Sequence, residues 1–215
     1  MAKQKKEDGE QKLPDANDAL RAILGNKEMK EDIYNNIVPE NKVISTGSLI
    51  LDSHVKIRSG QVVRVVGKGA ELGKTSECFV IAENFMKTME KSKTIFFKAE
   101  GRLSKEMMKR TGLKFVFSVD EWEYGTVFVL CCNIFETIAS TFLSVIKAAH
   151  ANGEHICGIL DSLDGAILKA DLEKGFTGNN KVAGVPLLTK LLFRQIALPV
   201  AHYDALLMVT GQFAA

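Results

Sequence analysis

The sequence predicts an α/β fold in which a mostly parallel sheet carries helices on both faces. Short apolar runs typical of buried strands, at 62–66, 94–97 and 156–160, alternate along the chain with segments of helical periodicity. With 215 residues, of which 46% are hydrophobic, the chain is large enough to bury one sizeable core. We therefore expect one α/β core over residues 41–215, preceded by an appendage of residues 1–40.

The composition indicates an ordinary soluble globular protein. The net charge of +2 is weaker than a dedicated nucleic-acid-binding domain usually carries, so charge leaves the partner open. Apolar runs stay well below the ~20 residues of a membrane span, and the lysine-rich start lacks the apolar core of a secretion signal. Four cysteines without C-x-x-C spacing favour free thiols in a reducing compartment, namely Cys78, Cys131, Cys132 and Cys157. These features predict a cytoplasmic protein without membrane contact.

Residues 1–40 are expected to form a polar tail followed by two short helices. Residues 1–12 alternate lysine with acidic and amide side chains, which predicts a disordered, solvated tail; a basic arm for DNA is the alternative. Helical patterns then run over 19–25 and over 29–37, which Pro39 ends. Such a lead-in would suit docking on a neighbouring subunit.

Residues 62–76 place a β-branched run, a glycine-containing turn and Gly-Lys-Thr in succession. This order predicts a strand, a phosphate loop and a helix. Glycines let backbone N–H groups approach phosphate oxygens, a lysine reaches the outer phosphates, and a hydroxyl ligates Mg²⁺. The helix that follows is amphipathic and points its positive end at the anion. We therefore expect a nucleotide to bind at Gly69, Ala70, Glu71, Leu72, Gly73, Lys74, Thr75 and Ser76.

This loop departs from the usual G-x-x-x-x-G-K-[ST] spacing. Counting back from Gly73 places Lys68 at the first glycine position, with Gly67 one residue too early. Either the loop is one residue longer than usual or Gly69 takes over the role. The alternative interpretation of the segment is a lysine-rich surface turn between a strand and a helix.

Two acidic residues follow predicted buried strands. Glu100 comes after 94–97, and Asp161 comes directly after 156–160. Ligands of parallel α/β sheets lie at the carboxyl ends of the strands. There, Glu100 would polarise an attacking water, and Asp161 would hold Mg²⁺ together with Thr75. An ordinary exposed glutamate is the alternative for Glu100, and a strand-end Asp alone is a weak signal.

Capping signals mark two further helices. Ser104 is expected to cap a short helix that ends at Gly112, and Asn133 with Glu136 resembles the capping box of a long helix. Between these helices, Trp122 is expected to pack within the fold rather than to stack on bases.

The remaining segments complete the alternation of strands and helices. A helix is expected over 187–198, where Pro199 stops it. His150 and His155 have no second ligand at metal spacing, so both are expected to be structural or solvent-facing. Further strands are expected at 115–117, 127–130 and 205–210.

One stretch before the first core strand carries a family resemblance. Residues 45–48, Ser-Thr-Gly-Ser, are followed two residues later by Leu51-Asp52, and further on by a glycine-flanked stretch that ends in Gly-Lys-Thr. Together these motifs resemble the start of the RecA recombinase core, especially the phage-type, UvsX-like RecA proteins. The resemblance extends over about 43–212. Residues 53–58 replace the glycine-rich segment that the family has between the two motifs.

The resemblance implies roles for individual residues. Lys74 would hold the β- and γ-phosphates of ATP, Glu100 would activate the attacking water, and Gln212 would sense the terminal phosphate and relay its state to DNA. Ser104 to Met107 would contact adenine, with Met107 in place of the family's stacking tyrosine. The connection 175–181 would be the first of two DNA-binding loops, with an ordinary surface loop as the alternative. Its candidate DNA contacts are Phe176, Asn179, Asn180 and Lys181.

The function that the resemblance implies is that of an ATP-dependent DNA recombinase. Such a protein binds single-stranded DNA, hydrolyses ATP with Mg²⁺ and self-associates in a filament during homologous recombination and DNA repair. It would act in the cytoplasm or, if phage-encoded, in the host cytoplasm. The family core continues beyond the strand that leads to Gln212, so the chain is expected to be a shortened or degenerate member. Two alternatives stay open: a non-hydrolysing nucleotide-binding or interaction module, and a P-loop motor of the hexameric helicase type, which would form rings.

Overall fold

The computed structural model describes residues 15–27, 33–34, 41–69, 72–101, 103–173 and 185–212. The chain divides into two units, Met1–Ile37 and Val38–Ala215, and each is described by itself. Within the described ranges, no helix combines the length and the apolar character needed to cross a membrane.

The first unit contains helix α1, Ala16–Gly25. Asp15 caps this helix because its side chain accepts a hydrogen bond from the backbone N–H of Asp18 at 2.8 Å. This confirms the first of the two predicted lead-in helices. The predicted tail over 1–12 and most of the second helix, 29–37, lie outside the described residues.

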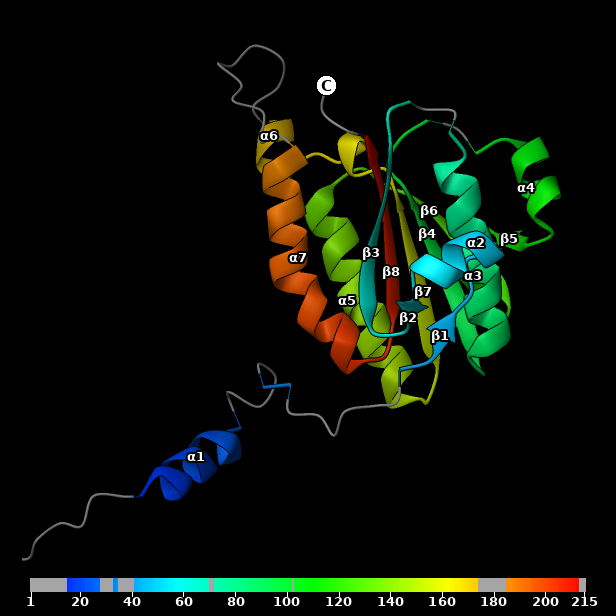
Figure 1. Ribbon diagram of the computed structural model, residues 1–215. Helices are drawn as coiled ribbons and strands as arrows, with labels where there is room; N and C mark the ends of the chain where they lie inside the picture. Colours follow the sequence, from blue (N-terminus) through cyan, green and yellow to red (C-terminus); the bar gives the residue numbers. More distant parts are fainter. Residues whose placement is uncertain are drawn as a thin grey trace, which may run out of the picture. The chain divides into compact units, whose positions relative to one another are not determined.

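The second unit is built on a six-stranded sheet in which every neighbouring pair of strands is parallel. The strand order is β3-β8-β7-β4-β6-β5, and the carboxyl ends of the strands lie at one edge (Figure 1). The predicted parallel α/β architecture is therefore confirmed. The strands are β3 (Gln61–Gly67), β4 (Ser92–Lys98), β5 (Lys114–Val116), β6 (Thr126–Cys131), β7 (His155–Asp161) and β8 (Leu206–Gln212).

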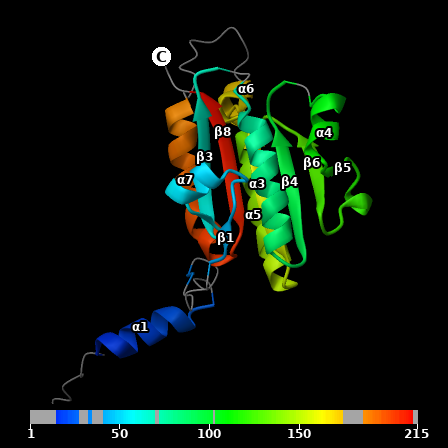
Figure 2. The same cartoon turned by 45° about the vertical axis from the view of Figure 1, so that its right-hand side comes forward.

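Helices cover both faces of this sheet (Figure 2). Helix α3 (Lys74–Thr88) lies on one face, and α5 (Phe135–Ala151) and α7 (Val185–His202) lie on the other. Successive side chains of β4 enter opposite layers, as the pleat requires. Phe96 meets Phe79 of α3 with ring centroids 5.0 Å apart, whereas Phe97 meets Phe142 of α5 at 6.2 Å. Both apolar layers that the sequence pattern predicts are thus filled.

Gly158 in the middle of β7 permits the close approach of α5 to the sheet. A Cβ atom at this position would lie 2.5 Å from the ring of Phe142 and 2.9 Å from Leu207. Both neighbours belong to the fully packed α5 and α7 layer. A glycine inside a buried strand therefore has a packing reason here.

A small antiparallel sheet precedes the main one and contains the Ser-Thr-Gly-Ser motif. Strand β1 (Val43–Ile44) pairs with β2 (Ile57–Arg58), and helix α2 (Leu49–His54) connects them. The carboxylate of Asp52 accepts hydrogen bonds from Ser45 Oγ at 2.6 Å, Thr46 Oγ1 at 2.7 Å and Thr46 N at 2.8 Å. These bonds, with that from Ser45 the strongest, lower the pKa of Asp52. In this chain the Ser-Thr-Gly-Ser motif therefore holds the turn between β1 and α2 through its hydrogen bonds to Asp52.

The shorter elements agree with their sequence signals. Helix α4 (Lys105–Thr111) begins after Ser104, whose Oγ accepts from Met107 N, and it ends at Gly112, which has φ +69°. The indole N–H of Trp122 donates to the Thr94 carbonyl at 3.0 Å, which confirms its packing role. The remaining short elements are η1 (Val119–Glu121), η2 (Leu163–Gly165) and α6 (Lys169–Glu173).

The expected end of the last helix at Pro199 is wrong, because α7 continues through this residue to His202. Pro199 cannot donate to the carbonyl one turn earlier, but the following turn is held by other interactions. Val200 is fully buried, and Tyr203 N donates to the Pro199 carbonyl at 2.9 Å. Burial of this last turn outweighs the missing hydrogen bond.

The expected capping box at the start of α5 is also wrong. The N-cap is Ile134, without a side-chain cap, and the carboxylate of Glu136 instead accepts from Lys169 N at 3.0 and 3.2 Å. Backbone bonding replaces the cap, because Phe135 N donates to the Ile167 carbonyl at 2.9 Å and Ile167 N donates to Asn133 at 2.8 Å. A contact with a segment distant in sequence, Ile167, thus holds the start of α5, which the local motif predicts to be capped by a side chain.

Candidate functional site

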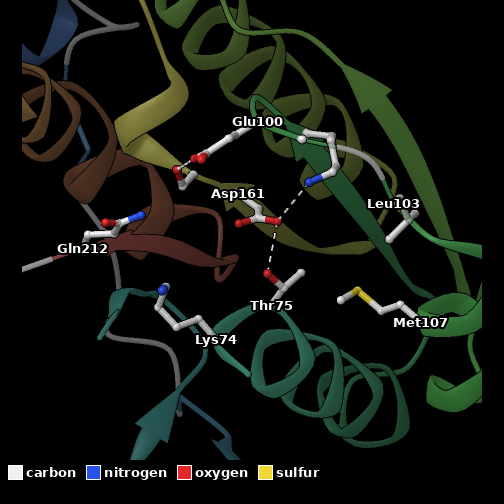
Figure 3. Close-up of a pocket in the computed structure, with 10 residues that line it drawn as sticks. Lys74, Thr75, Glu100, Leu103, Met107, Asp161 and Gln212 are labelled. Atoms are coloured by element: carbon white, nitrogen blue, oxygen red, sulfur yellow. Dashed lines mark hydrogen bonds and ion pairs between the residues drawn. The ribbon is translucent and has the colours of Figure 1, made fainter. Parts of the chain in front are cut away.

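A pocket of about 270 Å³ opens at the carboxyl edge of the sheet (Figure 3). Its walls come from the start of α3, the ends of β4, β7 and β8, and α4 with the segment that leads into it. Sequence reasoning predicts six of the residues that line it, and the fold brings these together from positions far apart in the chain: Lys74, Thr75, Glu100, Met107, Asp161 and Gln212.

The loop before α3 uses a left-handed glycine to open the helix. Gly73 has φ +74° and is the N-cap of α3, so a side chain at this position would be strained. Lys74 follows at once, is only 9% exposed, and donates from Nζ to the Gly69 carbonyl at 2.5 Å. Its ammonium therefore lies within the curve of the loop, beside the N-terminus of α3. Of the other predicted loop contacts, Leu72 and Ser76 do not line the pocket, and Ala70 and Glu71 lie outside the described residues.

The carboxylate of Asp161 connects three elements. Its Oδ2 accepts from Thr75 Oγ1 of α3 at 3.1 Å and faces Lys98 Nζ of β4 at 3.3 Å, while its Oδ1 accepts from Thr210 Oγ1 of β8 at 2.8 Å. Thr75 and Asp161, the two predicted Mg²⁺ ligands, are thus in direct contact. Lys98 and Thr210 are partners that the sequence reasoning missed.

The donor atoms at Asp161 fit a magnesium ion that is bound together with phosphate. A hydroxyl and a carboxylate oxygen are ligand types that Mg²⁺ takes, and it usually completes its shell with phosphate oxygens and water. Among the described residues, no group of three or more His, Cys, Asp or Glu side chains could hold a metal ion. The residues present therefore suit a shared protein and phosphate site rather than a cage made by protein alone.

Glu100 is held against the end of β7 by both backbone and side-chain contacts. The backbone N–H groups of Ala99 and Glu100 donate to the Asp161 carbonyl at 2.8 and 3.3 Å. Ser162 Oγ donates to Glu100 Oε2. Gly165 leaves room for this arrangement, because a Cβ atom there would lie 2.8 Å from Glu100 Cβ. The carboxylate therefore lies at the pocket in a fixed orientation.

Gln212 is the last residue of β8 and lines the side of the pocket opposite Leu103 and Met107 (Figure 3). Its backbone N–H donates to Asp164 Oδ2 at 2.8 Å, which fixes the end of the strand beside η2. Asp164 is a second supporting residue that no motif indicated. Both supporting residues, Asp164 and the Glu100 partner Ser162, follow Asp161 within three residues, so the stretch after a strand-end Asp is the signal that would have found them.

The wall nearest α4 is apolar. Met107 and Leu103 line it, and their side chains suit contact with the face of a flat ring. Ser104, which was also predicted to touch a base, does not line the pocket, because its hydroxyl accepts from Met107 N at 3.0 Å and caps α4. Its position is therefore explained by helix capping.

The predicted DNA-binding residues lie outside the part of the chain that the structure describes, and they remain predictions: Phe176, Asn179, Asn180 and Lys181. In comparisons with known proteins, no family model matches this chain and no curated protein matches it.

Proposed function

We propose that this protein binds and hydrolyses ATP in the carboxyl-edge pocket, as a P-loop ATPase of RecA type. The observation that carries the proposal is the convergence of Lys74 and Thr75 with the strand-end residues Glu100, Asp161 and Gln212. An ammonium, a hydroxyl, two carboxylates and an amide at one helix N-terminus are the groups with which proteins perform phosphoryl transfer.

Binding would rest on the start of α3. The Lys74 ammonium and the free backbone N–H groups of the first helical turn compensate the charge of the outer phosphates. Thr75 and Asp161 would hold Mg²⁺, which would neutralise the charge that develops on the phosphate oxygens. The apolar pair Leu103 and Met107 would cover one face of the base.

Hydrolysis would depend on Glu100. Its carboxylate accepts the proton of the attacking water, and the Ser162 hydroxyl orients it by donating to Oε2. Gln212 lines the same pocket, on the side opposite Leu103 and Met107, where its amide can contact the terminal phosphate (Figure 3).

Steady-state release of phosphate from ATP, measured with and without single-stranded DNA, tests the proposal on the full chain. We expect Mg²⁺-dependent turnover that single-stranded DNA increases. The absence of ATP binding in a calorimetric titration would contradict the proposal.

A second candidate, a nucleotide-binding module that does not hydrolyse ATP, is favoured by one specific observation. The ammonium of Lys98 lies 3.3 Å from the Asp161 oxygen that also contacts Thr75, and so it occupies part of the expected metal position. ATP binding without measurable turnover would identify this second candidate.

Action as a DNA recombinase is the further part of the proposal, and it concerns the segment 175–181. If this segment contacts DNA, Lys181→Ala should remove one phosphate contact. The slope of log affinity against log salt concentration should then fall by roughly one unit. Fluorescence anisotropy of a labelled oligonucleotide at several salt concentrations measures this slope. Lys87→Ala, at the far end of α3, is the matched control and should leave the slope unchanged.

A further inference from the structure

The carboxyl-edge pocket contains a second lysine that the ATPase mechanism does not use. Lys98 is the last residue of β4 and pairs in register with Asp161, the last residue of β7. Its Nζ lies 3.3 Å from Asp161 Oδ2, and the two side chains are only 10% and 14% exposed. Strand pairing therefore places this ammonium against the acid, independently of any loop.

The contact involves the same carboxylate oxygen that would bind a metal. Asp161 Oδ2 already accepts the Thr75 hydroxyl at 3.1 Å, and Oδ1 is occupied by Thr210 at 2.8 Å. A Mg²⁺ ion bound at Oδ2 would have to share this oxygen with the Lys98 ammonium or displace the ammonium from it. Because the pair is mostly buried, solvent screens the repulsion between the two cations only weakly.

Other protein groups lie near the ammonium of Lys98. Its Nζ atom lies 5.8 Å from the centroid of the Phe96 ring, and a Cβ atom at Gly101 would lie at an ordinary contact distance of 3.9 Å from it. Lys98 and Lys74 line the same pocket from different elements. A polyphosphate in this pocket would therefore meet two ammonium groups. The charge of Lys98 would offset the repulsion between the polyphosphate and the Asp161 carboxylate.

We propose that Lys98 is a built-in cation of the nucleotide site. Its charge allows a nucleoside triphosphate to bind without a divalent metal, and it lowers the affinity of Asp161 for Mg²⁺. This inference rests on the proposed function, since it requires that the pocket binds a nucleotide. In this role Lys98 contributes to nucleotide binding mainly through its positive charge and less through its hydrogen-bonding geometry.

The test measures binding, not turnover. Anisotropy of a fluorescent ATP analogue is recorded with the full chain in EDTA and during a titration with Mg²⁺. Four proteins are compared: wild type, Lys98→Met, Lys98→Arg and Lys93→Met. Lys93 is the matched control because it lies on the same strand and also pairs with a carboxylate, at 3.0 Å from Glu154, at the opposite end of the sheet.

We expect the wild type to bind the analogue in EDTA with an affinity within about threefold of that in excess Mg²⁺. Lys98→Met should bind at least about tenfold more weakly in EDTA, and Mg²⁺ should restore its affinity at about a tenfold lower concentration than acts on the wild type. Lys98→Arg, which keeps the charge, should behave like the wild type, and so should Lys93→Met.

Two outcomes would overturn the inference while leaving nucleotide binding intact. One is wild-type binding that is lost in EDTA, a result that needs no variant and holds even if Lys98→Met fails to fold. The other is an identical Mg²⁺ dependence of the wild type and a folded Lys98→Met protein. Failure of all four proteins to bind the analogue at any Mg²⁺ concentration would instead contradict the proposed function, and this inference with it.

Discussion

The two ends of strand β4 carry the same kind of ion pair in different surroundings. At the amino end, Lys93 lies 3.0 Å from Glu154, and at the carboxyl end Lys98 lies 3.3 Å from Asp161. Both pairs join β4 to the chain of β7, and both lysine ammonium groups lie within 6 Å of an aromatic ring, that of Trp122 at 5.2 Å and that of Phe96 at 5.8 Å. The chemistry available at each end nevertheless differs.

At the amino end, the charged groups are enclosed by aromatic side chains. Tyr124 donates its hydroxyl to Glu154 Oε1 at 2.8 Å, and Lys93 also lies over the Tyr124 ring at 5.3 Å. Burial acts to raise the pKa of Glu154, but the hydrogen bonds from Tyr124 and Lys93 hold it below its ordinary value. Lys93, Tyr124 and Glu154 do not line the carboxyl-edge pocket, so we interpret their interactions as a structural contact.

At the carboxyl end, the equivalent pair stands beside the N-terminus of α3 and borders an open pocket. Residue type and pairing therefore do not distinguish the two ends of β4. Their positions along the strand do, because parallel strands place helix N-termini and loop residues at their carboxyl ends. Predictions that change one end and use the other as a control test this difference directly.

The largest effect is expected for Lys74→Ala. Loss of the ammonium leaves phosphate charge uncompensated in the loop, so ATP affinity should fall at least ~100-fold, which corresponds to about 2.7 kcal/mol. Isothermal titration calorimetry measures this loss. Lys93→Ala at the amino end is the control and should bind ATP like the wild type. Equal affinity of the Lys74→Ala protein and the wild type would remove the phosphate site from this pocket.

Glu100→Gln is expected to separate binding from turnover. The amide keeps the size and a hydrogen bond to Ser162 but cannot take a proton, so the rate should drop on the order of 10²- to 10⁴-fold with ATP affinity retained. Steady-state phosphate release reports the rate, and Glu154→Gln serves as the amino-end control. An unchanged rate in Glu100→Gln would show that another group activates the water.

Sequence reasoning predicted those parts of the fold and site that depend on local pattern. The alternation of strands and helices, the caps at Ser104 and Gly112, and the strand-end acids Glu100 and Asp161 are all readable from neighbouring residues. Because parallel strands bring their carboxyl ends to one edge, these acids could also be expected to meet.

The missed features depend on contacts between distant segments. Lys98 contacts Asp161 because β4 lies next to β7, and this strand order is not visible in either segment alone. Glu136 was expected to cap its own helix but bonds to Lys169, 33 residues away. Pro199 has a local signal to end a helix, but burial of the next turn overrides it. Residues 70, 71 and 174–184 lie outside the described ranges, so the loop predictions there stay open.

A smaller effect, on stability alone, is expected for Gly158→Ala. Its added methyl group would meet Phe142 and Leu207 at less than 3 Å, and these neighbours are packed on all sides. Overpacking of this kind typically costs about 1–3 kcal/mol, which corresponds to a decrease in Tm of roughly 2–12 °C for a chain of this size. Thermal unfolding followed by circular dichroism measures the change. Gly153→Ala is unsuitable as a control because its φ is +67°; Gly25→Ala, with open space around its Cβ, is suitable.

The smallest effect is expected for Glu154→Gln at the amino end of β4, and its sign depends on pH. The folded pKa of Glu154 lies below its reference value of 4.5, so the carboxylate stabilises the fold above that pH and the stabilisation is lost as the pH falls through the lowered pKa. Because its ion pair is only partly buried, we expect the variant to be less stable by about 1 kcal/mol at pH 7, and a Tm decrease of roughly 2–4 °C.

The difference in Tm between the wild type and Glu154→Gln should therefore shrink as the pH falls below 4.5, and it should vanish once the pH has passed through the lowered pKa of Glu154 and the carboxyl is protonated in the folded protein. Thermal scans at several pH values measure it. Glu83→Gln is the matched control, since Glu83 pairs with Lys87 at 2.6 Å on the exposed side of α3, and such pairs contribute about 0.3–0.5 kcal/mol. If Glu154→Gln has no greater effect than this control at pH 7, the aromatic surroundings of Lys93 add nothing to the pair. The amino end of β4 would then be an ordinary surface contact, and the contrast with the pocket end would rest on Lys98 and Asp161 alone.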